Sequence, residues 1–421
     1  MFNIIFNFLI FYFFTLSLAI SATYYVDQNN IKASDKNPGT KELPWKTIQK
    51  AAFVAKAGDL VIIKKGTYDV GNSGVWSMPA VNPKYSGTPK APIIFRASPL
   101  HKVRIIGSPM PIGSYGRKYI VWDGFILGTK DGKRGGVIIF YSKGIVIKNC
   151  EIIGCYVPTS NNHDGIRVQK SEDIVIKNCK IHGIKGDSWN SAGIKFYFVK
   201  DTVVENCEIY DCYTGIFDKT GGIHNTYRRN IIYDTIGPSI YLYTQGRFLT
   251  DRIVICQNIF YKTNCLLINT YSPLVHKSVK VYNNVFYGLG IYIDRCANVQ
   301  IWNNIFYTKD FSIVTKAKVK IIYCDYNCFF PYAKFETGKY TKKEKKYKSL
   351  QEWQSFKGLD LFSINKDPLF VSPKKLNFHL KKESPCLKAG IDRQDYDNDG
   401  NINERINMGC YIENEVIGTN W

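Results

Sequence analysis

A short alternation of apolar and polar residues recurs seven times between Gly136 and Asn304. Each unit holds two or three runs of β-branched residues separated by Gly, Asn, Asp or Ser, which is typical of strands joined by turns. An Asn closes each unit and recurs every 20 to 29 residues, beginning with Asn149 and Asn178. A period of this size indicates a solenoid, because one unit cannot bury its apolar face without a stacked neighbour.

The units contain no convincing helical periodicity, which disfavours leucine-rich and helical repeats. We therefore expect an all-β parallel β-helix with one coil per unit. The recurring Asn residues are predicted to form a turn ladder, because Asn tolerates left-handed backbone and its amide can bond to the amides above and below. Cys150, Cys179 and Cys207 follow three of these Asn residues. They are predicted to form an inward column of small buried side chains.

One helix is expected before the first coil. Ile48, Ala51, Ala52 and Ala55 have helical spacing, and Gly58 ends the pattern. Such a helix would cover the open apolar end of the solenoid and block the addition of further strands.

Short motifs near both ends of the chain resemble one known group of proteins. Near the start they are residues 24–26, 37–40, 45–48, 58–59 and 66–68, and near the end residues 350–353, 358–360, 367–370, 384–385 and 389–390. Together they resemble the opening and closing segments of right-handed parallel β-helix proteins of the pectate-lyase-like superfamily. The resemblance implies a right-handed β-helix solenoid with an N-terminal capping helix. It leaves the activity open, because this superfamily includes lyases, hydrolases, epimerases and adhesins.

Charge and the N-terminal segment narrow the choice of partner. The chain has 421 residues and a formal net charge of +21, which favours an anionic partner over a merely soluble lysine-rich surface. Residues 1–22 are nearly all apolar and end in small residues, so we expect a signal peptide, or a membrane anchor if the segment is retained. The protein is therefore expected to be secreted, extracellular or in the cell envelope. An acidic polysaccharide is the expected partner, with no nucleic acid, and the chain is expected to be a monomer.

The predicted organisation has three parts. Residues 1–22 are the signal segment, residues 23–330 the parallel β-helix, and residues 331–421 the C-terminal coils and cap, with a Lys-rich loop at 339–348. The twelve Cys residues show no metal-binding CxxC spacing. Mostly buried thiols are expected, and Cys150–Cys155 and Cys207–Cys212 are the local pairs that could form disulfides.

Strand alternation predicts which side chains point outward on one sheet. The outward positions include cations beside aromatic rings: Arg167, Lys195, Lys219, Tyr197, Tyr241 and Tyr243. Cations neutralise carboxylates and flat rings suit sugars, so this surface is a candidate cleft for a polyuronate. The alternative is ordinary cross-strand stabilisation of an exposed sheet.

Carboxylates near this surface are candidate calcium ligands. Asp164 and Asp187 lie in turns that precede strands, and Asp218 occupies an inward position unless a bulge rotates it outward. Calcium takes oxygen ligands of this kind, although turn acids often serve only as caps. Residues 395–400 have the spacing of a calcium loop, but Ile406 stands where the acidic twelfth ligand belongs. A structural turn is the favoured interpretation there.

The preferred hypothesis for function is cleavage of an acidic polysaccharide by β-elimination. Lys219 is the candidate base, with Lys195 and Arg228 as neighbouring catalytic cations that lower its pKa. Several β-helix lyases are similar in using a Lys or Arg base with aspartate-bound calcium. Two alternatives stay open. A polygalacturonase-like hydrolase is suggested by residues 162–166, although the double aspartate expected on the next coil is absent. A non-catalytic glycan-binding or adhesive β-helix is the other.

Overall fold

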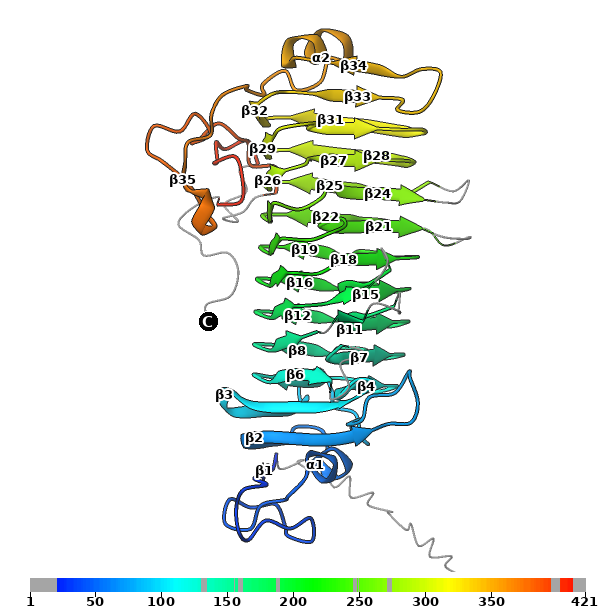
Figure 1. Ribbon diagram of the computed structural model, residues 1–421, viewed down its shortest axis with the longest axis vertical. Helices are drawn as coiled ribbons and strands as arrows, with labels where there is room; N and C mark the ends of the chain where they lie inside the picture. The colour runs from blue at the N-terminus through cyan, green and yellow to red at the C-terminus, as the bar shows by residue number, and fades with distance from the viewer. Residues whose placement is uncertain are drawn as a thin grey trace, which may run out of the picture.

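The structure is a computed structural model that describes residues 21–129, 135–154, 156–157, 162–186, 190–244, 248, 250–270, 275–394 and 402–411. Strands stack in successive coils from the blue N-terminal end to the yellow C-terminal end (Figure 1). The coils build a 21-stranded sheet, here called sheet A, and an 11-stranded sheet, here called sheet B. Neighbouring strands pair in parallel, except for the pairing of the last two strands of sheet B. The predicted all-β, right-handed parallel β-helix is confirmed.

Sheet B contributes one strand per coil. Its strands are β4 (Ile112–Tyr115), β7 (Val137–Phe140), β11 (Asp164–Gln169), β15 (Ala192–Tyr197), β18 (Thr214–Lys219), β21 (Ile240–Thr244), β24 (Leu266–Thr270), β27 (Ile291–Ile293), β30 (Ile313–Thr315), β33 (Phe335–Thr337) and β34 (Lys345–Tyr347).

Sheet A usually contributes two strands per coil, separated by a bend. Its strands are β1 (Thr23–Val26), β2 (Leu60–Asn72), β3 (Ile93–Ser108), β5 (Ile120–Asp123), β6 (Ile126–Thr129), β8 (Val146–Lys148), β9 (Glu151–Ile153), β12 (Val175–Lys177), β13 (Lys180–His182), β16 (Val203–Glu205), β17 (Glu208–Tyr210), β19 (Thr226–Arg228), β20 (Ile231–Tyr233), β22 (Ile253–Cys256), β23 (Ile259–Tyr261), β25 (Val279–Tyr282), β26 (Val285–Gly288), β28 (Cys296–Trp302), β29 (Ile305–Thr308), β31 (Val319–Asp325) and β32 (Cys328–Pro331). Two short pairs lie outside these sheets, β10 (Tyr156–Val157) with β14 (Lys185–Gly186), and β35 (Phe370–Ser372) with β36 (Asn377–Leu380).

The core lies between the sheets and runs the length of the solenoid. Inward residues of sheet B, such as Ile166 on β11 and Ile194 on β15, are fully buried with inward residues of sheet A such as Ile176 and Val204. Each coil therefore buries its apolar side against the coils above and below, as the sequence period predicts.

The inward column at the bend of sheet A changes residue type along the solenoid. Cys150, Cys179 and Cys207 occupy it in three successive coils and are fully buried. The column then continues with buried Asn residues, namely Asn230, Asn258, Asn284, Asn304 and Asn327. The backbone amide of Cys207 donates to Asn230 Oδ1 at 3.0 Å, which joins the two parts.

The predicted single Asn ladder is therefore wrong in its alignment. Asn149, Asn178 and Asn206 lie one position earlier, in left-handed backbone with φ of 51–53°. Arg229 takes that left-handed position in the next coil, which places Asn230 in the inward column. The Asn therefore stands one residue later in this unit than in the units before it. Aligning the units on their Asn residues combines two different columns of side chains.

The Cys residues of this region are thiols. Cys150, Cys207 and Cys212 are free and buried, which agrees with the expected buried thiols and leaves the possible Cys207–Cys212 pair unformed. The other possible pair, Cys150–Cys155, includes Cys155, which lies outside the described residues. Burial raises the pKa of Cys150 and Cys179 well above its ordinary value, so both stay protonated in the core.

Helices close both ends of the solenoid. α1 (Ile48–Val54) begins at Thr47, whose hydroxyl accepts from the Lys50 amide, and it buries Ile48, Ala51 and Ala52 against the first coils. α2 (Leu350–Lys357) covers the other end and ends at the left-handed Gly358. The predicted N-terminal capping helix is present as α1 (Figure 1).

The chain after α2 returns along sheet A. The segment containing β35, the short 3-10 helix η1 (Pro373–Lys375) and β36 lies beside β26 and β29 (Figure 1). Phe378 packs against Tyr287, with ring centroids 5.6 Å apart. Residues 1–20 and the acidic segment 395–400 lie outside the described residues. Within the described part of the chain, no helix is long and apolar enough to cross a membrane.

Candidate functional site

The outward face of sheet B carries two columns of side chains, as strand alternation predicts. In the first column, Arg167 on β11 is in register with Lys195 on β15, which is in register with Phe217 on β18. In the second column, Tyr197 is in register with Lys219. Neighbouring parallel strands lie about 4.8 Å apart, so these side chains lie side by side on the outward face of sheet B, where Lys195 and Phe217 are nevertheless fully buried.

Asp164 lies at the centre of this surface. Its Oδ1 is 2.6 Å from Lys195 Nζ and its Oδ2 is 3.3 Å from Arg167 Nη1. The side chains of Asp164 and Lys195 are fully buried, and that of Arg167 is nearly so. We call Asp164, Arg167, Lys195 and Lys219 the cation cluster. It holds three cations around one carboxylate.

Two Asn residues support the cluster from the turns before β11 and β15. Asn162 Oδ1 accepts from Lys195 Nζ at 3.1 Å and from Arg167 Nη1 at 3.4 Å. Asn190 accepts from Lys195 through its carbonyl oxygen and from Lys219 Nζ through Oδ1 at 3.1 Å. From the sequence, Asn162 is assigned only to the hydrolase-like stretch 162–166, and Asn190 is given no role in the site. Each stands two residues before its strand in successive coils, and this shared offset is the signal that could have identified them.

Lys219 is the more accessible amine of the cluster. It is half-buried, whereas Lys195 is fully buried. Its Nζ lies 5.5 Å from the ring centroid of Tyr197 and 5.7 Å from that of Phe217. Lys219 thus faces the outer surface with aromatic rings around its ammonium group.

Burial and neighbouring cations change the protonation of both lysines. Burial lowers the pKa of Lys195 to about 8, against the opposing effect of Asp164, and Arg167 and Lys219 lower it further. Burial also lowers the pKa of Lys219, again opposed by Asp164 and assisted by Arg167. A lysine amine with a lowered pKa can act as a base near neutral pH.

Aromatic side chains continue the surface beyond the cluster. Phe217 and Tyr241 stack with centroids 4.8 Å apart and nearly parallel planes. Tyr241 is 7% exposed and Tyr243 is 5% exposed, so their faces offer little area for a sugar in this conformation. Tyr197 is partly buried, and Arg167 lies over its ring at 5.0 Å. Burial raises the pKa of Tyr197 to about 12, and the charge of Asp164 adds to this.

Arg228 does not belong to this surface. It lies on β19 of sheet A, exposed, and its guanidinium binds Glu205 at 2.6 and 2.9 Å. The prediction that Arg228 lies beside Lys219 is wrong, because the turn after Lys219 carries the chain onto the other sheet.

Asp218 points into the core rather than outward. It is in register with the buried Phe196 and Leu242. Its Oδ2 accepts from Tyr227 Oη at 2.6 Å and from Asn225 Nδ2 at 3.0 Å. Burial raises the pKa of Asp218 to about 6, and the two hydrogen bonds oppose this. No bulge rotates it outward, so it lies on the opposite face of the sheet from Lys219.

Two of the three predicted calcium ligands, Asp164 and Asp218, do not lie in one site. Asp164 is bound by two cations, Asp218 faces the core, and Asp187 lies outside the described residues. Among the residues that the structure describes, no group of three or more His, Cys, Asp or Glu side chains is arranged to hold a metal. With three cations around one carboxylate, the cation cluster carries a net positive charge that attracts an anion.

Comparisons with known proteins agree with this fold. The sequence model of a family described as "Right handed beta helix region" matches residues 129–286, and that of "Protein of unknown function (DUF1565)" matches residues 31–78. The uncharacterized protein YwoF of Bacillus subtilis (strain 168) is 32% identical over 143 residues, which cover 34% of this chain and 27% of that protein.

Solved structures show the same architecture at low identity. Pectate lyase Pel9A superposes with a TM-score of 0.57 at 13% identity, covering 94% of this chain and 98% of that one. A mannuronic acid specific polysaccharide family 6 lyase from human gut microbiota superposes with a TM-score of 0.52 at 12% identity, covering 70% and 75% of the two chains. This chain is a right-handed parallel β-helix protein with a pectate-lyase-like fold.

Proposed function

We propose that the protein cleaves an acidic, uronate-containing polysaccharide by β-elimination on the outward face of sheet B. The observation that carries the proposal is the cation cluster, in which a half-buried lysine of lowered pKa lies beside two buried cations. The two solved lyases with this fold, a pectate lyase and a mannuronic acid specific lyase, support the same class of substrate.

Each cluster residue has a distinct role in this proposal. Neutral Lys219 takes the proton on the sugar carbon next to the carboxylate. The electrons of that C–H bond form a carbon–carbon double bond, the bond to the glycosidic oxygen breaks, and the departing oxygen takes a proton from water. The hydroxide that remains takes the proton from Lys219, which returns the amine to its neutral form. Arg167 and Lys195 stabilise the negative charge that develops on the carboxylate during proton removal. Asn162 and Asn190 position the two lysines.

The geometry weighs against the hydrolase alternative. A glycoside hydrolase needs two carboxyl groups at the scissile bond, one of them free to donate a proton. The carboxylate of the cation cluster, Asp164, binds Lys195 and Arg167. Its negative charge is paired with those two cations, so it is not placed to donate a proton to a leaving group.

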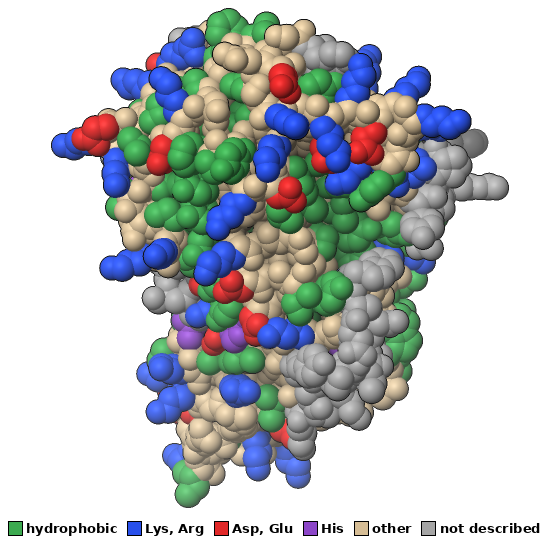
Figure 2. All heavy atoms as spheres, turned by 45° about the horizontal axis from the view of Figure 1, so that its top comes forward, with side chains coloured by type: hydrophobic (Ala, Val, Ile, Leu, Met, Phe, Trp, Pro, Cys, Tyr) green, Lys and Arg blue, Asp and Glu red, His purple; other side chains and the backbone are tan. Residues whose placement is uncertain are grey.

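The surface charge fits an anionic polymer. On the face shown in Figure 2, Lys and Arg side chains are more widespread than Asp and Glu side chains. This agrees with the formal net charge of +21. We propose that the protein meets its polymer outside the cytoplasm, because residues 1–22 have the pattern of an export signal.

An absorbance assay tests the proposal. The protein is incubated with polygalacturonate and with polymannuronate, and the ultraviolet absorbance of an unsaturated uronate is followed together with reducing ends. A rise in both signals supports elimination. Reducing ends without absorbance would mean hydrolysis, and polymer binding with neither signal would mean a binding protein; either result overturns the proposal.

A further inference from the structure

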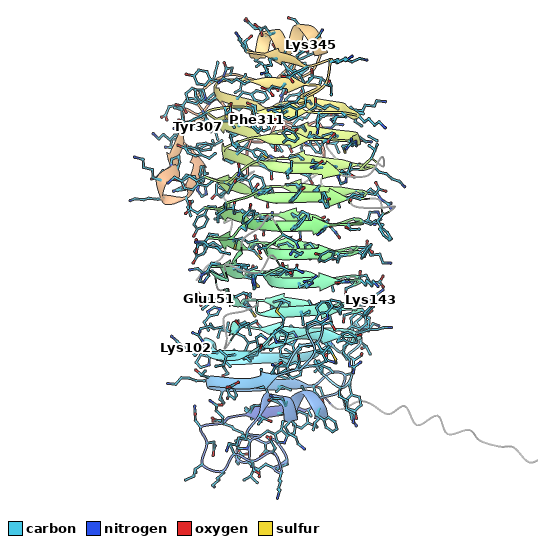
Figure 3. All side chains as sticks on the ribbon, turned by 45° about the vertical axis from the view of Figure 1, so that its right-hand side comes forward. Lys102, Lys143, Glu151, Tyr307, Phe311 and Lys345 are labelled. Carbon is cyan, nitrogen blue, oxygen red and sulfur yellow. The ribbon has the colours of Figure 1, made fainter. Side chains whose placement is uncertain are left out.

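A second surface of the solenoid has the chemistry of a polyanion site. A groove of about 770 Å³ runs along the turns that lead from sheet B to sheet A. We call it the turn groove. Its lining residues include Tyr141, Lys143, Lys170, Glu172, Phe198, Lys200, Phe248 and Arg252. Figure 3 shows Lys143 on the flank of the solenoid away from Glu151.

The turn groove is separate from the cation cluster. None of Asp164, Arg167, Lys195 and Lys219 is among its lining residues. The two surfaces are nevertheless adjacent, because Tyr197 and Lys219 end their strands and Phe198 and Gly221 follow in the turns. A long polymer can therefore reach both surfaces by passing around the C-terminal ends of these strands.

Positive charge dominates the turn groove. Its lining holds six basic side chains and two acidic ones, an excess of four positive charges. Glu172 binds Lys143 at 2.9 Å and Lys200 at 2.5 Å. These two lysines lower the pKa of Glu172 to about 2, so it stays charged and holds them in place. Lys118, Lys170 and Lys277 are exposed along the same groove.

Exposed aromatic rings lie between these cations. Tyr141 is 51% exposed and Phe248 is 50% exposed. Phe198 packs edge-on against Phe248 with centroids 4.5 Å apart. Lys170 Nζ donates to the Tyr141 hydroxyl at 3.2 Å and lies 5.2 Å from its ring centroid. Rings beside ammonium groups suit a ligand that combines apolar ring faces with carboxylates, as an acidic sugar does.

The spacing of the groove suits a linear polymer. Backbone bridges join Lys143 to Glu172 and Glu172 to Lys200, so equivalent positions repeat once per coil at about 4.8 Å. We propose that the turn groove is a second, non-catalytic binding site for a segment of an acidic polysaccharide that extends from the cation cluster. The identity of the polymer rests on the proposed function; binding in the groove does not require cleavage.

Matched substitutions test the groove. Lys170 and Tyr141 both have left-handed backbone, with φ of 48° and 50°, and Asn tolerates that conformation. The double variant Lys170→Asn/Tyr141→Asn is compared with Lys318→Asn/Tyr340→Asn. The control residues have φ of 51° and 60°, are exposed and lie outside the groove.

Binding and kinetics are measured with long polygalacturonate and with its trimer. We expect the groove variant to bind the long polymer about tenfold more weakly and to raise its KM, with kcat and trimer cleavage unchanged. The control variant should match the unmodified protein. Equal polymer affinity of the groove and control variants overturns the proposal, even if cleavage is observed. Groove-dependent binding without any unsaturated product supports the groove and overturns the proposed cleavage instead.

Discussion

Lys195 and Asp164 form a fully buried ion pair, with Lys195 Nζ 2.6 Å from Asp164 Oδ1 and neither side chain exposed. Burial removes both charged groups from water, which costs free energy. Their mutual attraction offsets this desolvation cost only while both charges are present. The pair also connects neighbouring coils, because Asp164 begins β11 and Lys195 lies on β15. It therefore fixes the outer face of sheet B at the place where Arg167 and Lys219 both lie over the ring of Tyr197.

Asp164→Asn is predicted to lower the free energy of unfolding by about 3 kcal/mol at neutral pH. The reason is that Lys195 and Arg167 lose their counter-charge in a buried site. Chemical denaturation measures this. The double variant Asp164→Asn/Lys195→Met should lose less stability than Asp164→Asn alone. An equal or larger loss in the double variant would contradict a role for the ion pair.

Lys219→Met is predicted to lower cleavage by roughly 10²–10⁴-fold, the usual contribution of a general base. The fold should persist, because Lys219 is only half-buried. The rate of unsaturated product formation is the measurement. Lys320→Met is the matched control, since Lys320 is exposed on β31 of sheet A. Undiminished activity of Lys219→Met would remove Lys219 from the mechanism.

Metal chelation is predicted to leave cleavage unchanged. Arg167 and Lys195 already supply positive charge beside Lys219, and Asp164 is occupied by both cations. The rate is measured before and after dialysis against a chelator, and again after calcium is restored. A loss of activity that calcium reverses would show that the cations are insufficient.

Asp218 is predicted to make stability depend on pH. Its pKa is about 6 in the folded protein, compared with about 3.9 in an unfolded chain. The folded state binds the proton more tightly, so this contribution is fully present below pH 4 and is lost as pH rises through 6. The free energy of unfolding of the unmodified protein, relative to Asp218→Asn, should fall by about 2–3 kcal/mol between pH 4 and pH 7. Chemical denaturation of both proteins at intervals of one pH unit measures this difference. A difference that stays constant between pH 4 and pH 7 would refute the raised pKa of Asp218.

Asn258→Ala is predicted to lower the free energy of unfolding by about 3 kcal/mol, because it leaves several buried polar groups without partners. Asn258 Oδ1 accepts from Asn230 Nδ2, and Asn258 Nδ2 donates to Asn284 Oδ1, each at 3.0 Å. Asn178→Gly is the comparison, since Asn178 is only partly buried and its left-handed backbone suits Gly. Asn178→Gly should lower the free energy of unfolding by about 1 kcal/mol or less. Similar losses of unfolding free energy in both variants would show that an inward Asn stabilises the fold no more than an Asn at the left-handed bend.

Some features of the site were predictable because strand alternation is local. The outward positions of Arg167, Lys195, Tyr197 and Lys219 follow from a period of two residues along each strand, and the register confirms them. The shared position of Asn162 and Asn190 was also visible in the sequence. Their hydrogen bonds were not, because those depend on how the turns before β11 and β15 fold over the sheet.

Other features could not be predicted from residue types alone. Arg228 is close to Lys219 in the chain but lies on the other sheet, paired with Glu205. The change from the Cys column to the Asn column depends on which residue takes the left-handed bend, and Arg229 takes it in one coil where Asn does in others. Only the backbone register distinguishes these two columns.

The sequence by itself determined that this chain is a parallel β-helix, because apolar alternation and a fixed period force each coil to bury its face against the next. It also determined which side of each strand carries the cations. The tertiary structure alone decided that Asp164 pairs with Lys195 and Arg167, and that Asp218 faces the core. Those outcomes depend on distances of a few ångströms between residues of different coils, and coil stacking and turn geometry set these distances.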